Sequence, residues 1–343
     1  MKIALMTDIR KIAVKDIPKA GALPGEILIK VMRCFICGSD LTIFHGKHPW
    51  AIRPLVMGHE FSGVVEAHGK GVKKPKIGTR VAVIPHRVCG KCPACKKKVY
   101  NFCESLRCMG AEAHGAYAEY ISVPAEMVVP ISKNMSFEDA ALLEPACVAL
   151  HAVKRVGSLK GKNVLVVGAG PIGAFAVQAA KALGAKKVFI ADTDEWRLNL
   201  VKKFKVTAAL NIKKTKLENA LKRIGTSIKE IDVFFVCVGM EGVVLDEILR
   251  LARRGTDIVM VGVLRREYNL PHLPEFVQHE LTLYGTTMYV PEDFRHMIRL
   301  MSEGKVSTKG LKTHEFKLEE IQKVFAFIEA RKEPFFKIML KNN

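Results

Sequence analysis

The sequence contains no apolar run approaching the ~20 residues that a membrane-spanning helix needs, so we expect no membrane partner. Its opening residues, MKIALMTDIRKIAV, place charge inside every apolar stretch, and we therefore expect no secretory signal peptide. No low-complexity tract or internal repeat is apparent. The cysteine count of 9 is odd, so the thiols cannot all be paired. Together these absences predict a cytoplasmic protein in a reducing compartment.

Acidic residues are also in deficit, with 34 Asp and Glu against 54 Lys and Arg and a formal net charge of +20. A surplus of this size attracts anionic partners such as nucleic acid. The basic residues are dispersed in short groups rather than gathered in one block. We therefore expect the charge mainly to set solubility, and no specific nucleic-acid partner.

The texture of the chain changes near residue 146. Before it, short β-branched runs alternate with Gly and Pro, as at Ile27–Met32 and Arg80–Ile84, and these predict strands. After it, helical patterns alternate with short apolar strands, which is typical of βαβ units on a parallel sheet. The predicted parallel strands are Asn163–Val167, Lys187–Ala191, Asp232–Cys237 and Asp257–Val261. With 343 residues, 49% of them hydrophobic, the chain has room for two domains with cores of their own.

Four cysteines occur within the segment CGKCPACKKKVYNFC, at Cys89, Cys92, Cys95 and Cys103. Thiolates this close, separated by Gly and Pro, can close a tetrahedral S4 cage around one zinc ion. Such a cage has no open coordination position, so it predicts a structural zinc rather than a catalytic one. A pair of disulfides and a four-iron cluster are the alternatives for the same four residues.

A glycine-rich loop follows the first predicted parallel strand in the segment VLVVGAGPIGAFAVQAAKALGA. A strand before the loop and an Ala-rich helix after it are the context that a dinucleotide-binding fingerprint requires. The next strand ends at Asp192, whose carboxylate suits the ribose hydroxyls of NAD and repels the 2′-phosphate of NADP. Arg197 weakens this preference because it can contact phosphate. The loop residues assigned to the cofactor are Gly168, Gly170, Pro171, Ile172 and Gly173.

A second group of metal-binding residue types is spread along the chain at Cys37, in the pair His59–Glu60, and at Glu144. A thiolate, an imidazole and carboxylates form an open zinc site if they meet in space. Sequence spacing alone does not show that they meet. A dinucleotide fold nearby favours the site, since hydride transfer from an alcohol needs a Lewis acid or a base at the alcohol oxygen.

Taken together, the motifs resemble the zinc-dependent medium-chain dehydrogenases, particularly their sorbitol and L-threonine dehydrogenase branches. The segments that carry the resemblance occur in the family's order, and the resemblance covers essentially the whole chain. They are ICGSDLTIFHG, MGHEFSGVVEAHG, the four-cysteine loop, LLEPACVALHA and VVGAGPIG. The resemblance implies an α/β protein with two domains. A GroES-like, mainly-β catalytic domain at 1–146 is completed by 287–343, and a Rossmann domain with a doubly wound parallel sheet lies at 147–286.

The resemblance assigns Cys37, His59 and Glu60 as ligands of a catalytic zinc, so that each subunit holds two zinc ions. Glu144 matches a further carboxylate that binds the zinc or a zinc-bound water. Ser39 matches the hydroxyl that hydrogen-bonds the substrate oxygen. Asp40 matches a residue that orients its neighbours or caps a turn.

Other expectations also rest on the resemblance. Val263 and Thr286 match positions that line the nicotinamide pocket. Many members carry a His five residues after the ligand Cys as the outer end of a proton relay, but here that position is Thr42. His45 is a candidate substitute for it, and an ordinary loop residue is the alternative.

The expected reaction moves a hydride from a secondary alcohol, such as a polyol, sugar alcohol or sugar acid, to NAD, with NADP less favoured. L-Threonine 3-dehydrogenase is the alternative activity. The resemblance also implies a homo-oligomer, either a dimer or a tetramer.

Overall fold

The computed structural model describes residues 1–239, 243–262 and 272–342. By its internal contacts the chain divides into two compact units. The first unit comprises Met1–Glu144, Val290–Arg295 and Thr308–Asn343, and the second comprises Pro145–Tyr289 and His296–Ser307. The tail therefore returns to complete the first unit. Among the described residues, no helix combines the length and the apolar character needed to cross a bilayer.

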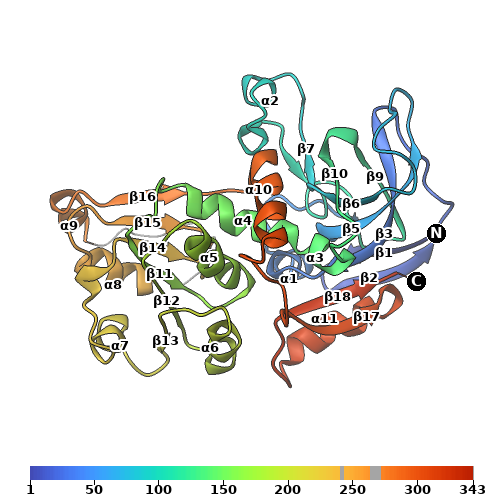
Figure 1. The fold of residues 1–343 in the computed structure, drawn as a ribbon. Helices are drawn as coiled ribbons and strands as arrows, with labels where there is room; N and C mark the ends of the chain where they lie inside the picture. The colour runs from blue at the N-terminus through green and yellow to red at the C-terminus, as the bar shows by residue number, and fades with distance from the viewer. Residues whose placement is uncertain (240–242, 263–271, 343) are drawn as a thin grey trace. The chain divides into compact units, whose positions relative to one another are not determined.

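The first unit is built mainly from strands (Figure 1). Its largest sheet has the strand order β10-β6-β5-β3-β18-β17, with β9 also paired to β3. A smaller sheet has the order β2-β1-β4, and β7 pairs with β8. The strands are β1 (Lys2–Asp8), β2 (Lys11–Asp16), β3 (Glu26–Phe35), β4 (Leu55–Val56), β5 (Glu60–His68), β6 (Arg80–Val83), β7 (His86–Arg87), β8 (Arg107–Cys108), β9 (Tyr120–Pro124), β10 (Val128–Pro130), β17 (Lys312–Lys317) and β18 (Lys337–Lys341). The helices wholly within this unit are α1 (Gly38–Phe44), α2 (Pro93–Lys96), α3 (Phe137–Ala141) and α11 (Ile321–Ala330).

The second unit contains a six-stranded parallel sheet with the order β13-β12-β11-β14-β15-β16. Numbered along the sheet's own sequence this order is 3-2-1-4-5-6, which defines the doubly wound dinucleotide-binding fold. The strands are β11 (Asn163–Val167), β12 (Lys187–Asp192), β13 (Ala208–Asn211), β14 (Val233–Val236), β15 (Asp257–Met260) and β16 (Thr282–Gly285). Its helices are α5 (Pro171–Ala182), α6 (Glu195–Lys202), α7 (Leu217–Lys222), α8 (Val243–Leu251) and α9 (Leu273–Gln278), and the helices α4 (Leu143–Lys154) and α10 (Pro291–Ser302) span the unit boundaries.

The predicted fold class is confirmed, and its physical cause is visible in the central strands. Strand β11 reads NVLVV and strand β14 reads VFFV, and nearly all of these residues are buried. A continuous apolar run is what a parallel strand requires when helices cover both faces of its sheet. Helix α5 lies against β11 and β12, and helix α6 lies against β12 and β13.

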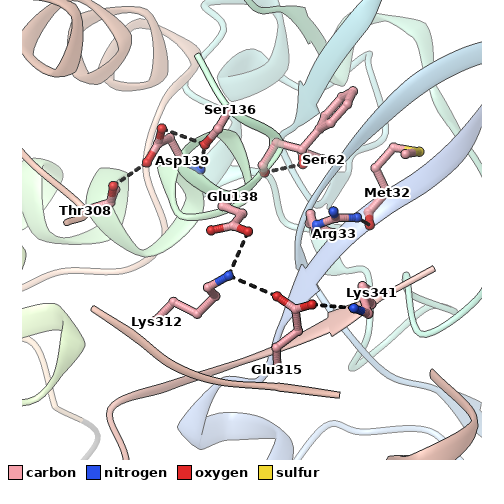
Figure 2. A network of polar contacts seen from close by, with 11 residues as sticks. Met32, Arg33, Ser62, Ser136, Glu138, Asp139, Thr308, Lys312, Glu315 and Lys341 are labelled. Carbon is pink, nitrogen blue, oxygen red and sulfur yellow. Dashed lines mark hydrogen bonds and ion pairs between the residues drawn. The ribbon is translucent and has the colours of Figure 1, made fainter. Parts of the chain in front are cut away.

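The tail is tied to helix α3 of the first unit by a chain of polar contacts (Figure 2). The ammonium group of Lys312 donates to Glu138 at 2.8 Å and to Glu315 at 3.0 Å. Lys341 pairs with the other oxygen of Glu315 at 2.7 Å. Thr308 donates to Asp139, the residue that the cap of α3 also engages. Residues far apart in sequence thus join one surface network.

We expect this network to make the free energy of unfolding depend on pH in the acid range. Hydrogen bonds lower the pKa of Glu315 to about 2, and the bond from Lys341 contributes more than the bond from Lys312. Because its folded pKa lies below the unfolded value, the stabilisation is present above about pH 5 and is lost as the pH falls toward 2. Solvent screening limits the effect to about 1 kcal/mol. Urea unfolding of the parent and of Glu315→Gln between pH 6 and pH 3 measures it. Equal pH slopes for the two proteins would contradict this account.

Candidate functional site

The segment after strand β3 presents the first predicted metal ligand. Cys37 is the N-cap residue of helix α1, and the carboxylate of Asp40 accepts the Cys37 amide at 2.8 Å. This reciprocal cap fixes the turn in which the thiol lies. Ser39, the residue assigned to the substrate oxygen, is half-buried in the first turn of the same helix.

The pair His59–Glu60 enters the site where strand β5 begins. Gly58, with φ +94°, makes the preceding turn in a conformation that favours glycine. One ligand atom from each of Cys37, His59 and Glu60 lies within 4.8 Å of the others. The structure therefore brings together three side chains that are separated by up to 23 positions in sequence.

This group has the chemistry of a zinc site with one open position. A soft thiolate, an imidazole and a carboxylate are donors that zinc accepts, and three protein ligands leave a fourth place for water or substrate. Burial lowers the pKa of His59, but the Asp40 carboxylate and the Cys37 thiolate outweigh it and raise the pKa well above its usual value. Within the described residues, His59 Nδ1 has no hydrogen-bond partner and lies 3.6 Å from Asp40 Oδ1. The surroundings thus favour a cation between these groups.

Glu144 is buried beside the three-ligand group but does not belong to the set within 4.8 Å. Burial raises its pKa to about 7, and the nearby Glu60 carboxylate acts in the same direction. A direct bond from Glu144 to the metal stays a prediction. Cys108 is half-buried and interacts electrostatically with His59 and Glu144, although sequence spacing gave no sign of it.

Lys337 is the main residue of this site that the sequence did not indicate. It lies on β18 in the returning tail and is 2% exposed. Its ammonium group forms an ion pair with Glu60 and donates to the Ile36 carbonyl at 2.8 Å. The nearby carboxylate and thiolate keep the pKa of Lys337 raised despite its burial. One oxygen of Glu60 is therefore engaged by a cation.

The four-cysteine segment forms a second, closed group. Its four sulfurs lie within 4.8 Å of one another, with Cys89 to Cys95 at 3.9 Å and Cys89 to Cys103 at 3.7 Å. Four sulfurs held tetrahedrally at about 2.3 Å from one zinc lie about 3.8 Å apart, so this geometry fits. All four cysteines are unpaired thiols, and amide donors from Lys91 and Cys92 lower the pKa of Cys89 to about 6. The geometry is too open for S–S bonds.

The glycine loop lies between strand β11 and helix α5 in the second unit. Gly170 is the N-cap residue of α5 and Pro171 occupies its first turn, with Ile172 next. A Cβ on Gly173 would come 1.8 Å from the Gly168 carbonyl oxygen, so only glycine allows helix and loop to approach this closely. The free amides at such a helix start attract a pyrophosphate group.

Asp192 ends strand β12 next to this loop. Its carboxylate accepts the amides of Ala169 at 2.5 Å and Asp194 at 2.8 Å, which fix its orientation. Arg197 pairs instead with Asp194 at 3.6 Å. Thr286 follows strand β16, and within the described residues its buried hydroxyl has no partner, which suits a ligand group. Val263 lies outside the described residues.

His45, the candidate for the relay, is the C-cap residue of helix α1. Its Nε2 lies 2.6 Å from a carboxylate oxygen of Glu329 on α11. Thr42 donates to the Gly38 carbonyl at 3.4 Å and is exposed. The relay role of His45 stays a prediction.

Two families match consecutive parts of the chain. The alcohol dehydrogenase GroES-like domain matches residues 23–133, and the zinc-binding dehydrogenase family matches residues 171–303. Sorbitol dehydrogenase of Bacillus subtilis is 33% identical over 100% of this chain and 98% of its own length. L-Galactonate-5-dehydrogenase of Escherichia coli is 36% identical over 88% of this chain and 87% of its own length. L-Threonine 3-dehydrogenase of Pyrococcus furiosus is 34% identical over 95% of this chain and 94% of its own length.

The solved structures agree with these matches. The crystal structure of galactitol-1-phosphate dehydrogenase from Escherichia coli is similar over 100% of both chains, with a TM-score of 0.91 and 28% identity. The chain belongs to the zinc-dependent medium-chain alcohol dehydrogenase family. It is an oxidoreductase of that family, and the predicted class of protein is confirmed.

Proposed function

We propose that the protein oxidises a secondary alcohol of the polyol, sugar-alcohol or sugar-acid type to a ketone, with NAD as the hydride acceptor. The observation that carries the proposal is the open Cys37–His59–Glu60 group in a chain that also has a dinucleotide loop. Relatives named for sorbitol, L-galactonate and galactitol 1-phosphate support a polyhydroxylated substrate. The Asp192 carboxylate at the end of β12 favours NAD over NADP.

In this proposal, residues of the first unit bind the metal and remove the proton from the alcohol. Cys37 and His59, with Glu60, would hold a zinc ion, which when bound acts as a Lewis acid toward the alcohol oxygen. Ser39, next to the ligand turn, accepts the alcohol proton in this proposal and passes it outward. Burial raises the pKa of Glu144 to about 7, so this proposal assigns Glu144 to exchange a proton in the same region. The four-thiolate group would hold a second, structural zinc.

L-Threonine 3-dehydrogenase is the second candidate activity, favoured by the relative from Pyrococcus furiosus. A threonine substrate needs partners for its carboxylate and its ammonium group. A polyol or sugar alcohol needs neither, and a sugar acid needs no partner for an ammonium group. Relatives named for several different polyhydroxylated compounds support the first proposal.

We also propose a homo-oligomer, a dimer or tetramer, in the cytoplasm. Among the described strands, β16 pairs only with β15 and so leaves one edge free. Leu273 and Val277 on the neighbouring helix α9 are 54% and 66% exposed. An unpaired edge strand next to exposed apolar side chains is a surface that a second copy can cover.

The decisive experiment follows NADH formation by the zinc-loaded protein. Polyols, sugar acids, L-threonine and simple secondary alcohols are screened with NAD+ and NADP+ in parallel. We expect chelator-sensitive turnover of a polyol or sugar acid, faster with NAD+. Turnover of L-threonine alone would replace the proposal with the second candidate, and turnover that survives removal of all zinc would refute the metal assignment.

A further inference from the structure

Asp40 lies buried between two of the metal-ligand positions, and its two carboxylate oxygens have different surroundings. Oδ2 accepts two hydrogen bonds, from the Cys37 amide at 2.8 Å and from the Tyr117 hydroxyl at 2.7 Å. Oδ1 accepts none among the described residues, and it lies 3.6 Å from His59 Nδ1, which has no other partner there. The two donors on Oδ2 therefore decide where Oδ1 points.

Tyr117 is held on every side, so its hydroxyl has a fixed position. It is fully buried. Its amide donates to the Met57 carbonyl at 2.9 Å, and its carbonyl accepts the Ala4 amide at 2.8 Å. A Cβ on Gly58 would come 2.5 Å from the Tyr117 ring, so the ring fills the space left by the glycine that precedes His59.

We propose that Tyr117 is a positioning residue for the metal ligand His59 and acts through Asp40. Its hydroxyl fixes the carboxylate, and the free carboxylate oxygen holds the Nδ1–H group of His59. The proton then stays on Nδ1, and Nε2 is left as the acceptor that faces the metal. The inference rests on the proposed function for the identity of the metal site. The contacts that carry it, the hydrogen bond from Tyr117 to Asp40 and the 3.6 Å approach of Asp40 to His59, lie wholly within the first unit.

The expected consequence is in metal binding. Carboxylates that orient a ligating His raise its basicity, and their loss typically costs 10–100-fold in metal affinity. Without the phenol, the Cys37 amide alone holds Asp40 Oδ2, and the carboxylate gains freedom to rotate away from the imidazole. The loss should be smaller than for removing the carboxylate itself, because Asp40 still carries its charge.

The test compares two tyrosine-to-phenylalanine variants. Tyr117→Phe keeps the buried ring and removes the hydroxyl, and we expect about a tenfold loss of zinc affinity at the open site in chelator competition. With Co(II) at that site, the visible absorption bands should shift relative to the parent. Tyr284→Phe is the matched control, because its hydroxyl also donates to a carboxylate, that of Asp257 at 3.2 Å, but in the second unit. It should change neither readout.

A second variant keeps the inference testable if Tyr117→Phe folds poorly. Asp40→Asn preserves the volume but turns an amide N–H toward His59 Nδ1, which forces the proton onto Nε2. We expect a larger loss of zinc affinity and a shift of the Co(II) bands. Adding Tyr117→Phe to Asp40→Asn should cause little further loss, because both act along one chain.

Two outcomes would overturn the inference. One is a Tyr117→Phe protein with the zinc affinity and Co(II) spectrum of the parent. The other is a loss of the same size in the Asp40→Asn background, which would show that Tyr117 does not act through the carboxylate. Failure of the alcohol screen with these metal effects intact would refute the proposed function and leave this inference standing.

Discussion

Replacing Lys337 with Met is expected to lower the free energy of unfolding by about 3–5 kcal/mol. Lys337 and Glu60 are 2% and 1% exposed and form an ion pair, and Lys337 also donates to the Ile36 carbonyl at 2.8 Å. The substitution removes the cation and leaves a buried carboxylate without its partner. An uncompensated buried charge costs far more than a lost surface pair. Urea unfolding of the metal-free proteins measures the difference.

Lys341→Met is the control for this prediction because it lies on the same strand. Lys341 pairs with Glu315 at the surface, so its loss should cost at most about 1 kcal/mol. Adding zinc gives a further readout. If Glu60 binds the metal as predicted, the bound cation partly replaces Lys337, and the destabilisation should shrink. Equal losses for the two lysine variants would show that the buried pair does not stabilise the unit.

Much of the fold could be predicted because the sequence patterns match its elements. Strand β11 was predicted at its observed limits, and β14 lies within the predicted segment, since a buried parallel strand is a continuous apolar run. The ends of other strands were harder to predict from the sequence. Strand β3 continues to Phe35, three residues beyond the predicted run Ile27–Met32, because pairing with β5 and β18 extends it regardless of local propensity.

The candidate site could be predicted only where its residues lie in recognisable motifs. Cys37, His59 and Glu60 are such residues, and the structure brings them together. Lys337 and Tyr117 are not, because each reaches the site through a contact between distant segments. Lys337 lies on the returning tail, 277 positions from Glu60, and Tyr117 reaches Asp40 across 77 positions. In the sequence, a lysine or tyrosine next to apolar residues gives no sign of such a partner.

Replacing Cys95 with Ser is expected to remove one zinc ion per chain and to lower the unfolding midpoint by on the order of 10 °C. The segment around the four cysteines has little else to hold it. Helix α2 has only four residues, Lys96–Lys98 are exposed, and Phe102 is 60% exposed. With one ligand lost, the remaining thiolates cannot complete the cage, and the segment should lose its structure. Metal analysis and thermal unfolding followed by circular dichroism measure both effects.

Measuring the turnover rate of the Cys95→Ser protein distinguishes a structural role of this zinc from a catalytic one. Because a closed S4 cage has no open coordination position, the turnover rate per remaining zinc at the open site should change little. Cys237→Ser, in the second unit and outside both metal groups, is the control and should keep the parent's zinc content. A Cys95→Ser protein with normal stability and full zinc content that had lost turnover would mean that the four-thiolate group takes part in the reaction. Retained turnover with lowered stability would establish that this zinc holds the segment in place.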